Sequence, residues 1–110
     1  MRVYKKQTAE AILTRQIRDI LRTVGYKHYK AWQGLGSEPG VSDIIGLTKE
    51  GQFFACEIKG PKGKLSSAQA YFLMEVKRSG GLAIVAHSVE DVIEGLNLQD
   101  RFIGYKTKEG

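Results

Sequence analysis

The chain has 110 residues and a mass of 12.2 kDa, with 42% hydrophobic and 26% charged positions. This size excludes a second domain and leaves room for one modest hydrophobic core. Seventeen Lys and Arg against twelve Asp and Glu give a net charge of +5, which suits a polyanionic partner such as nucleic acid but is also found on ordinary basic surfaces. A single cysteine, Cys56, excludes an internal disulfide, and no Cys/His cluster has the spacing of a zinc site.

The sequence shows no sign of membrane insertion or export. No apolar run approaches the ~20 residues that a membrane span needs, and the N-terminus lacks the apolar region and cleavage site of a signal peptide. We therefore expect a cytoplasmic protein with no membrane partner. One domain is expected over residues 1–98, followed by a basic tail at 99–110 that is flexible or belongs to a dimer interface.

The first predicted element is an amphipathic helix over residues 8–24 that ends at Gly25. Glu10 falls on the apolar stripe of this predicted helix, which is an unusual place for a charge. The alternative is a first-turn glutamate that the helix dipole favours and that water solvates at the helix end. The apolar stripe itself recurs at helical spacing and consists of Leu13, Ile17, Ile20, Leu21 and Val24.

Three strands are predicted next. Residues 26–32 alternate loosely and are typical of an edge strand, and a glycine-rich loop follows at 33–42. Residues 44–47 form a short strand, a hairpin turn follows at 49–51, and residues 52–59 form a third strand. One face of this third strand is predicted to carry Phe54, Cys56 and Ile58, and the other to carry Phe53, Ala55, Glu57 and Lys59.

The second half of the chain adds two helices and a strand. A basic loop at 60–65 leads into a helix from Ser66 to about residue 79, which a Gly-Gly pair stops. Residues 82–86 form an apolar strand, and a short helix runs from Ser88 to about residue 96. The order αβββαβα predicts an α/β fold in which an antiparallel hairpin and a right-handed parallel crossover make one mixed sheet flanked by helices.

Asp43, Glu57 and Lys59 are the side chains in this plan that point to chemistry. Asp43 begins one strand of the hairpin, and Glu57 and Lys59 share a face near the end of the other, so the hairpin can bring all three together. Two converging carboxylates repel each other unless a cation lies between them, and oxygen ligands favour Mg²⁺ or Mn²⁺. The lysine could then orient a water or neutralise charge on a phosphate. The alternative is an ordinary cross-strand cluster of surface charges.

Glu10 and Gln69 strengthen the functional interpretation, because both are polar residues on otherwise apolar helix stripes that face the sheet. For Gln69 the alternative is a capping box, in which its side chain returns to the backbone amide of Ser66.

These residues resemble the PD-(D/E)XK nuclease superfamily: an aspartate, then Glu57-Ile58-Lys59 at the end of the next strand, after a helix that bears a glutamate. The string GVSDIIGLTKEGQFFACEIKGPKGKLSSAQAYFLMEVKRSGGLAIVAHSVEDV resembles the VRR-NUC family in particular, and the resemblance runs from about Glu10 to Leu96.

The resemblance implies a compact nuclease core, a divalent-metal site with Mg²⁺ or Mn²⁺ as the cofactor, and hydrolysis of DNA phosphodiesters, often in branched or flapped DNA. It assigns metal binding to Asp43, Glu57, the Ile58 carbonyl, and Glu10 directly or through water. Lys59 matches the catalytic lysine, and Gln69 the glutamine that supports the site.

One departure is Ser42, which stands before the aspartate where the motif's name has proline and puts the pose of Asp43 in doubt. The chain resembles small stand-alone members from phage and bacteria, which are similar to Holliday-junction resolvases and act as homodimers. We therefore expect a homodimer in a bacterial cell, encoded by the host or a phage. Candidate interface residues are Tyr26, Tyr29 and Trp32 on the first strand and Phe102, Ile103 and Tyr105 in the tail. The alternative for any one of them is packing in a satellite of the core.

Contacts with DNA phosphates are expected first from Lys62 and Lys64 in the basic loop, and further from Lys5, Lys6, Lys27 and Lys30. Flexible basic loops favour recognition of backbone shape over base sequence. Neither histidine, His28 or His87, is assigned a role.

The sequence thus predicts a divalent-metal-dependent DNA endonuclease that is selective for Holliday junctions or other branched DNA. The alternatives are a restriction-like or nicking nuclease of other specificity, and a catalytically idle or partner-dependent DNA-binding protein on the same scaffold. A further alternative is a protein that acts only inside a larger replication or packaging complex.

Overall fold

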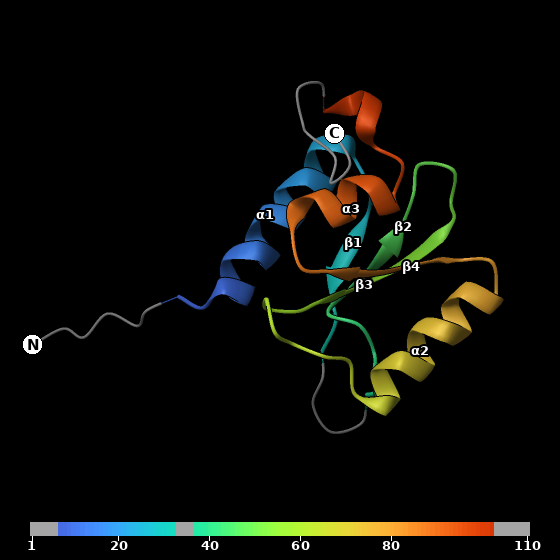
Figure 1. Cartoon of the computed structure of the whole chain (residues 1–110). Coiled ribbons are helices and arrows are strands. Elements are labelled where there is room, and N and C mark those ends of the chain that lie inside the picture. The colour runs from blue at the N-terminus through green and yellow to red at the C-terminus, as the bar shows by residue number, and fades with distance from the viewer. Residues whose placement is uncertain (1–6, 33–36, 103–110) are drawn as a thin grey trace, which may run out of the picture.

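A computed structural model describes residues 7–32 and 37–102 (Figure 1). Its elements follow the predicted order, with one short 3₁₀ helix added at the end. Within these residues no helix is long and apolar enough to cross a membrane. The elements are α1 (Ala9–Val24), β1 (His28–Lys30), β2 (Ile44–Leu47), β3 (Phe53–Ile58), α2 (Ser67–Arg78), β4 (Leu82–Ala86), α3 (Val89–Gly95) and η1 (Gln99–Arg101).

The strands form one mixed sheet in the order β1-β2-β3-β4. β1 and β3 both pair antiparallel to β2, and β4 pairs parallel to β3. The crossover from β3 to β4 runs through α2, which confirms the predicted α/β architecture. β1 has three residues where a strand over 26–32 was predicted, because only His28, Tyr29 and Lys30 pair in register with β2. The side chain of Tyr26, before the strand, lies in the core, where its ring centre is 6.2 Å from that of Phe54.

Helices cover both faces of the sheet. α1 and α3 pack on one face and form the larger core cluster, whereas α2 covers the other face (Figure 1). The predicted division of β3 is confirmed: Phe54, Cys56 and Ile58 belong to the larger cluster, and Ala55 to the smaller one under α2. β3 is therefore buried on both sides, and the face that carries Ala55 and Glu57 points toward α2.

The loop before β2 packs tightly against the first turn of α2. Gly40 adopts a left-handed backbone, with a φ of +76°, and a Cβ atom at this position would collide with the carbonyl group of Ala68. Only glycine allows this close approach. The contact holds the chain just before Asp43 against the helix that carries Gln69.

Several expectations about the surface need correction. Tyr26 is buried and cannot serve a dimer interface, whereas Tyr29 and Trp32 are exposed. Phe102, partly buried, packs against the larger core cluster, as the alternative of a core satellite predicted. The remaining expectations, for Ile103, Tyr105, Lys5 and Lys6, concern positions outside the described residues. The boundary at residue 98 stays a prediction.

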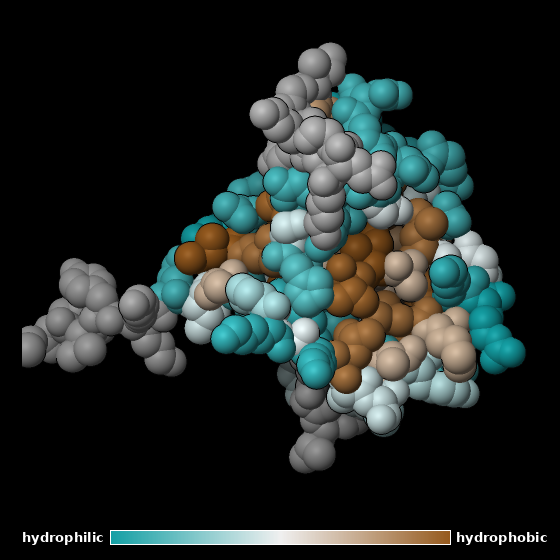
Figure 2. Space-filling model, viewed as in Figure 1, coloured by the Kyte–Doolittle hydropathy of each residue, from teal (hydrophilic) through white to brown (hydrophobic). Residues whose placement is uncertain are grey.

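β4 forms one edge of the sheet, and its residues Leu82, Ala83 and Val85 are only half-buried. In the view of Figures 1 and 2, hydrophobic residues gather where β4 passes between α3 and α2.

Candidate active site

The predicted meeting of Asp43 with the end of β3 is present. Because β2 and β3 are antiparallel, the start of β2 and the end of β3 lie at the same end of the sheet. Oδ2 of Asp43 accepts a hydrogen bond from the backbone amide of Ile58 at 2.7 Å. Asp43 also lies close enough to Glu57 to raise the pKa of its carboxyl group, so the two acids interact directly.

Glu57 is at the centre of the site and is only 2% exposed. Its Oε2 accepts a hydrogen bond from Nε2 of Gln69 at 3.1 Å and lies 3.5 Å from Nζ of Lys59. Its Oε1 is buried without a hydrogen-bond partner among the described residues. Burial first and the neighbouring Asp43 second raise the pKa of Glu57 to about 7, although Lys59 opposes this shift.

These properties fit a divalent cation. A buried carboxylate oxygen without a partner is costly, and two acids in contact share a proton unless a positive charge replaces it. Oxygen donors from Asp43 and Glu57, with the carbonyl of Ile58 next in the chain, are the kind that Mg²⁺ and Mn²⁺ prefer. Across residues 7–32 and 37–102, however, no group of three or more His, Cys, Asp or Glu side chains converges in a geometry that could hold a metal.

Gln69 combines the two roles that the sequence left as alternatives. Its side-chain Oε1 accepts a hydrogen bond from the backbone amide of Ser66 at 2.9 Å. The backbone amide of Gln69 donates to the Ser66 hydroxyl at 3.1 Å, which completes the capping box. Its Nε2 remains available and donates to Glu57. The first turn of α2 therefore fixes the orientation of the Glu57 carboxylate.

Glu10 does not lie where its place on the helical stripe predicted. It is exposed, because it sits in the first turn of α1 ahead of the part that packs on the core. Its Oε2 accepts a hydrogen bond from the backbone amide of Gly60 at 3.0 Å. Glu10 thus contacts the residue that follows Lys59, and its predicted role as a metal ligand stays a prediction.

The basic residues are divided between the two ends of the sheet. Lys62 and Lys64 are exposed on the loop that follows β3, and Lys30 pairs with Ile44, next to Asp43. Lys27 lies toward the opposite end, where its Nζ is 5.4 Å from the ring centre of Tyr29. The structure therefore brings Lys30, Lys62 and Lys64 to the end of the sheet that carries Asp43 and leaves Lys27 at the other end.

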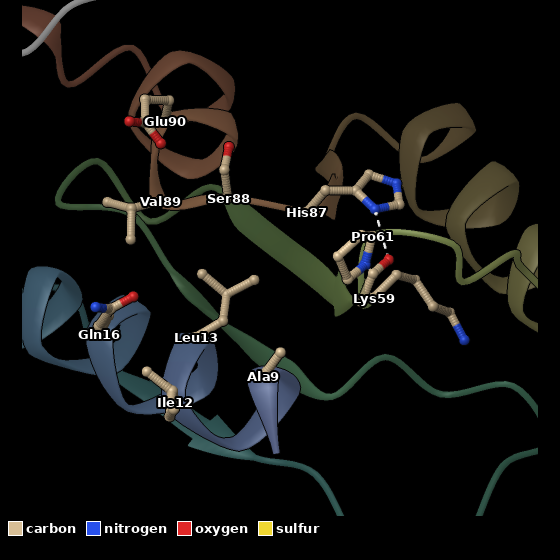
Figure 3. Close-up of a pocket in the computed structure, with 11 residues that line it drawn as sticks. Ala9, Ile12, Leu13, Gln16, Lys59, Pro61, His87, Ser88, Val89 and Glu90 are labelled. Atoms are coloured by element: carbon tan, nitrogen blue, oxygen red, sulfur yellow. Dashed lines mark hydrogen bonds between the residues drawn. The ribbon is translucent and has the colours of Figure 1, made fainter. Parts of the chain in front are cut away.

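A pocket of about 510 Å³ opens between α1 and the start of α3 and reaches the end of β3 (Figure 3). Ile12, Leu13 and Val89 contribute apolar walls, and Lys59 and His87 line the side nearest the site. In Figure 3 the side chain of Lys59 extends away from this pocket. His87 could not be singled out from the sequence, because only the fold shows what its ring contacts.

The site thus consists of two acids and a lysine at one end of a mixed sheet, supported by a glutamine from the crossover helix. The family model described as "VRR-NUC domain" matches residues 4–90, so the chain belongs to the VRR-NUC family.

A solved structure with a similar fold is that of Hjc, described as a Holliday junction resolvase from an archaeal hyperthermophile, Archaeoglobus fulgidus. It superposes with a TM-score of 0.52 at 23% sequence identity, over 68% of this chain and 64% of the resolvase chain. The chain therefore matches somewhat less than two thirds of the resolvase's length, and the likeness shows a shared fold. No curated protein matches the sequence.

Proposed function

We propose that the chain is a divalent-metal-dependent endonuclease that hydrolyses phosphodiester bonds in branched DNA. The observation that carries the proposal is the pair Asp43 and Glu57, in contact at the end of the sheet, with a buried Glu57 oxygen that lacks a partner among the described residues. Membership of the VRR-NUC family supports nuclease activity, and the fold shared with a Holliday junction resolvase supports branched DNA as the substrate.

Each side chain of the site takes a defined part in this mechanism. Asp43 and Glu57, with the Ile58 carbonyl and with Glu10 directly or through water, would hold Mg²⁺ or Mn²⁺. The cation would supply Lewis acidity at the scissile phosphate. Gln69 keeps the Glu57 carboxylate oriented through its 3.1 Å hydrogen bond.

Lys59 is the residue best placed to act on the reacting groups, because its ammonium lies at the edge of the acid pair. It orients the attacking water or stabilises the charge that develops on the phosphate. The water oxygen bonds to phosphorus, and the bond from phosphorus to one bridging oxygen breaks. One proton of the water leaves to solvent or to a neighbouring base, and the departing oxygen takes up a proton from solvent to become a hydroxyl group. A 5′- or 3′-phosphate remains, according to which bond breaks.

Recognition of DNA falls to the basic residues near the site. Lys62, Lys64 and Lys30 can bind phosphates on either side of the scissile bond, and none of them reads base identity. One site cuts one strand, so paired cuts in a junction need two copies of the chain, and we propose a homodimer. The exposed rings of Tyr29 and Trp32 are available for its interface. The enzyme would act on DNA in the cytoplasm of a bacterial cell, as a host or phage product.

The test is a cleavage panel on labelled four-way junction, replication fork, flap, single strand and linear duplex, each with Mg²⁺, Mn²⁺ or EDTA. Lys59→Ala should lose at least a hundredfold in rate. Lys49→Ala is the matched control, because Lys49 is an exposed lysine in the turn between β2 and β3, at the other end of the sheet.

Two results would overturn the proposal. Binding of DNA without metal-dependent cleavage of any substrate would favour an idle or partner-dependent DNA-binding protein. Equal cutting of linear duplex and junction would favour a restriction-like or nicking nuclease.

A further inference from the structure

The backbone of Gly60, the residue directly after Lys59, is bound by side chains of two other elements. Its amide belongs to the peptide group with Lys59 and its carbonyl to the peptide group with Pro61. Its amide donates to Oε2 of Glu10 on α1 at 3.0 Å. Its carbonyl accepts a hydrogen bond from Nδ1 of His87 at 3.1 Å, which Figure 3 shows as a dashed line. The amide of Gly63 also donates to this carbonyl, at 3.0 Å, and so closes the turn of the loop.

His87 is itself fixed by the start of α3. Its backbone amide donates to Oδ2 of Asp91 at 2.8 Å, and Ser88, the next residue, caps α3 by accepting from the amide of Asp91. A carbonyl oxygen only accepts hydrogen bonds, so Nδ1 of His87 carries the proton in this contact. The first turn of α3 therefore sets where the imidazole ring stands.

The placement of Gly60 matters because regular strand pairing stops just before it. The amide of Lys59 still bonds to the carbonyl of Ala86 at 3.0 Å, and beyond this bond the chain leaves the sheet. The carbonyl of Ile58 and the side chain of Lys59 lie within two residues of this exit. The two contacts on Gly60 therefore act on the backbone close to both groups.

We propose that His87 is a positioning residue of the active site. By holding the Gly60 carbonyl while Glu10 holds the Gly60 amide, it fixes the end of β3 and with it the Ile58 carbonyl and the Lys59 ammonium. The inference rests on the proposed metal-dependent function and extends it to a residue that touches neither metal nor phosphate.

The test compares His87→Leu, which removes the donor, with His87→Asn, whose side-chain amide can place a donor near the position of Nδ1. His28→Leu is the matched control, because Nδ1 of His28 also pairs with a backbone carbonyl, that of Tyr26 at 2.9 Å, on a strand two places away from β3. The first readout is Mn²⁺ binding to the DNA-free protein by titration calorimetry. The second is the ¹⁵N-edited NMR spectrum of the amides of Lys59 and Gly60.

His87→Leu should weaken Mn²⁺ binding about fivefold, the effect of losing one ordinary hydrogen bond. It should shift the Lys59 and Gly60 amide signals and lower kcat for cleavage by a similar factor, with KM for DNA unchanged. His87→Asn should restore most of the loss, and His28→Leu should leave metal affinity and both amide signals as in the wild type.

The proposal is overturned if His87→Leu is folded and binds Mn²⁺ as the wild type does. It is equally overturned if His28→Leu has the same effect, or if His87→Asn is no better than His87→Leu. A wild-type protein that binds no Mn²⁺ and cuts no DNA would instead refute the proposed function. In that case the amide spectra alone decide whether His87 holds the Gly60 carbonyl.

Discussion

The carboxyl group of Glu57 makes the stability of the protein depend on pH in an unusual direction. Its pKa is about 7 in the folded protein, against an ordinary value of 4.5, because burial and Asp43 disfavour its charged form. The folded state therefore binds more protons than the unfolded state between these two values. This contribution to stability is complete below pH 4.5 and is lost as the pH rises through about 7.

Glu57→Gln keeps the shape of the side chain and removes the charge. In EDTA at pH 8 we expect this variant to be about 2–3 kcal/mol more stable than the wild type, and the difference should disappear toward pH 4.5. Urea unfolding at a series of pH values measures the difference. Glu50→Gln, in the exposed turn between β2 and β3, is the control and should show no such trend. A gain that is the same at every pH would contradict the assigned cause.

Ser42 offers a second test at the level of one atom. Its side chain is fully buried, and its hydroxyl has no hydrogen-bond partner in the part of the chain that the structure describes. Ser42→Ala removes a polar group that is paired with water only in the unfolded chain, so we expect a gain of about 1 kcal/mol in unfolding free energy. Chemical denaturation measures this gain, and a loss of stability would show that the hydroxyl has a partner in solution.

Sequence reasoning predicted which side chains meet at the end of the sheet better than it predicted the exposure of others. The meeting of Asp43 and Glu57 was predictable because strand alternation and hairpin pairing place both side chains, and Gln69 was placed by helical spacing. Glu10 and Tyr26 were misjudged, since periodicity gives the direction of a side chain but not where the neighbouring elements end. The contact of His87 with the Gly60 carbonyl could not be predicted from the sequence, because it depends on how the loop after β3 folds back on β4.

Among the connecting elements, the loop that contains Gly40 has the strictest geometry. Gly40→Ala must adopt a left-handed backbone and also push against the carbonyl of Ala68, so the start of α2 has to move. Because this turn carries Gln69, we expect a loss of about 2–4 kcal/mol in stability and at least a tenfold loss in cleavage rate.

Gly51→Ala provides the matched comparison for this loop. Gly51 also has a positive φ, of +84°, but a Cβ atom there would meet nothing within 4 Å. We expect a loss of only about 1 kcal/mol and unchanged cleavage. Equal effects of the two substitutions in thermal unfolding would mean that backbone conformation alone, and not the contact with α2, explains the role of Gly40.

The boundaries of the elements were largely predictable where local chemistry sets them. Thr8 and Gly25 end α1, Ser66 begins α2 and Ser88 begins α3, each through a cap that the sequence makes visible. The length of β1 and the presence of η1 depend on packing against the rest of the fold. Local pattern therefore could not predict them.

At the scale of the whole molecule, metal binding and folding should be linked. A ligand that binds the folded state alone stabilises it by about 2.7 kcal/mol at a hundred times its dissociation constant. We expect Mn²⁺ or Mg²⁺ to raise the melting temperature more at pH 8 than at pH 6, because Glu57 must lose its proton to bind the cation. EDTA should reverse the effect. Asp43→Asn, measured by scanning calorimetry, should abolish it, and a shift that survives this substitution would place the metal elsewhere.

The two edges of the sheet differ in a way that limits how copies of the chain can join. The β1 edge carries the exposed lysines Lys27 and Lys30 beside the strand, whereas residues 82–86 of the β4 edge hold no charge. Charged side chains discourage pairing between strands, so of the two edges that the structure describes, the β4 edge is the one open to it. A sheet with one open edge can join a second copy once and then has no edge left. Concentrated protein that associates through this edge would stop at pairs, whereas two open edges would allow growth into fibres.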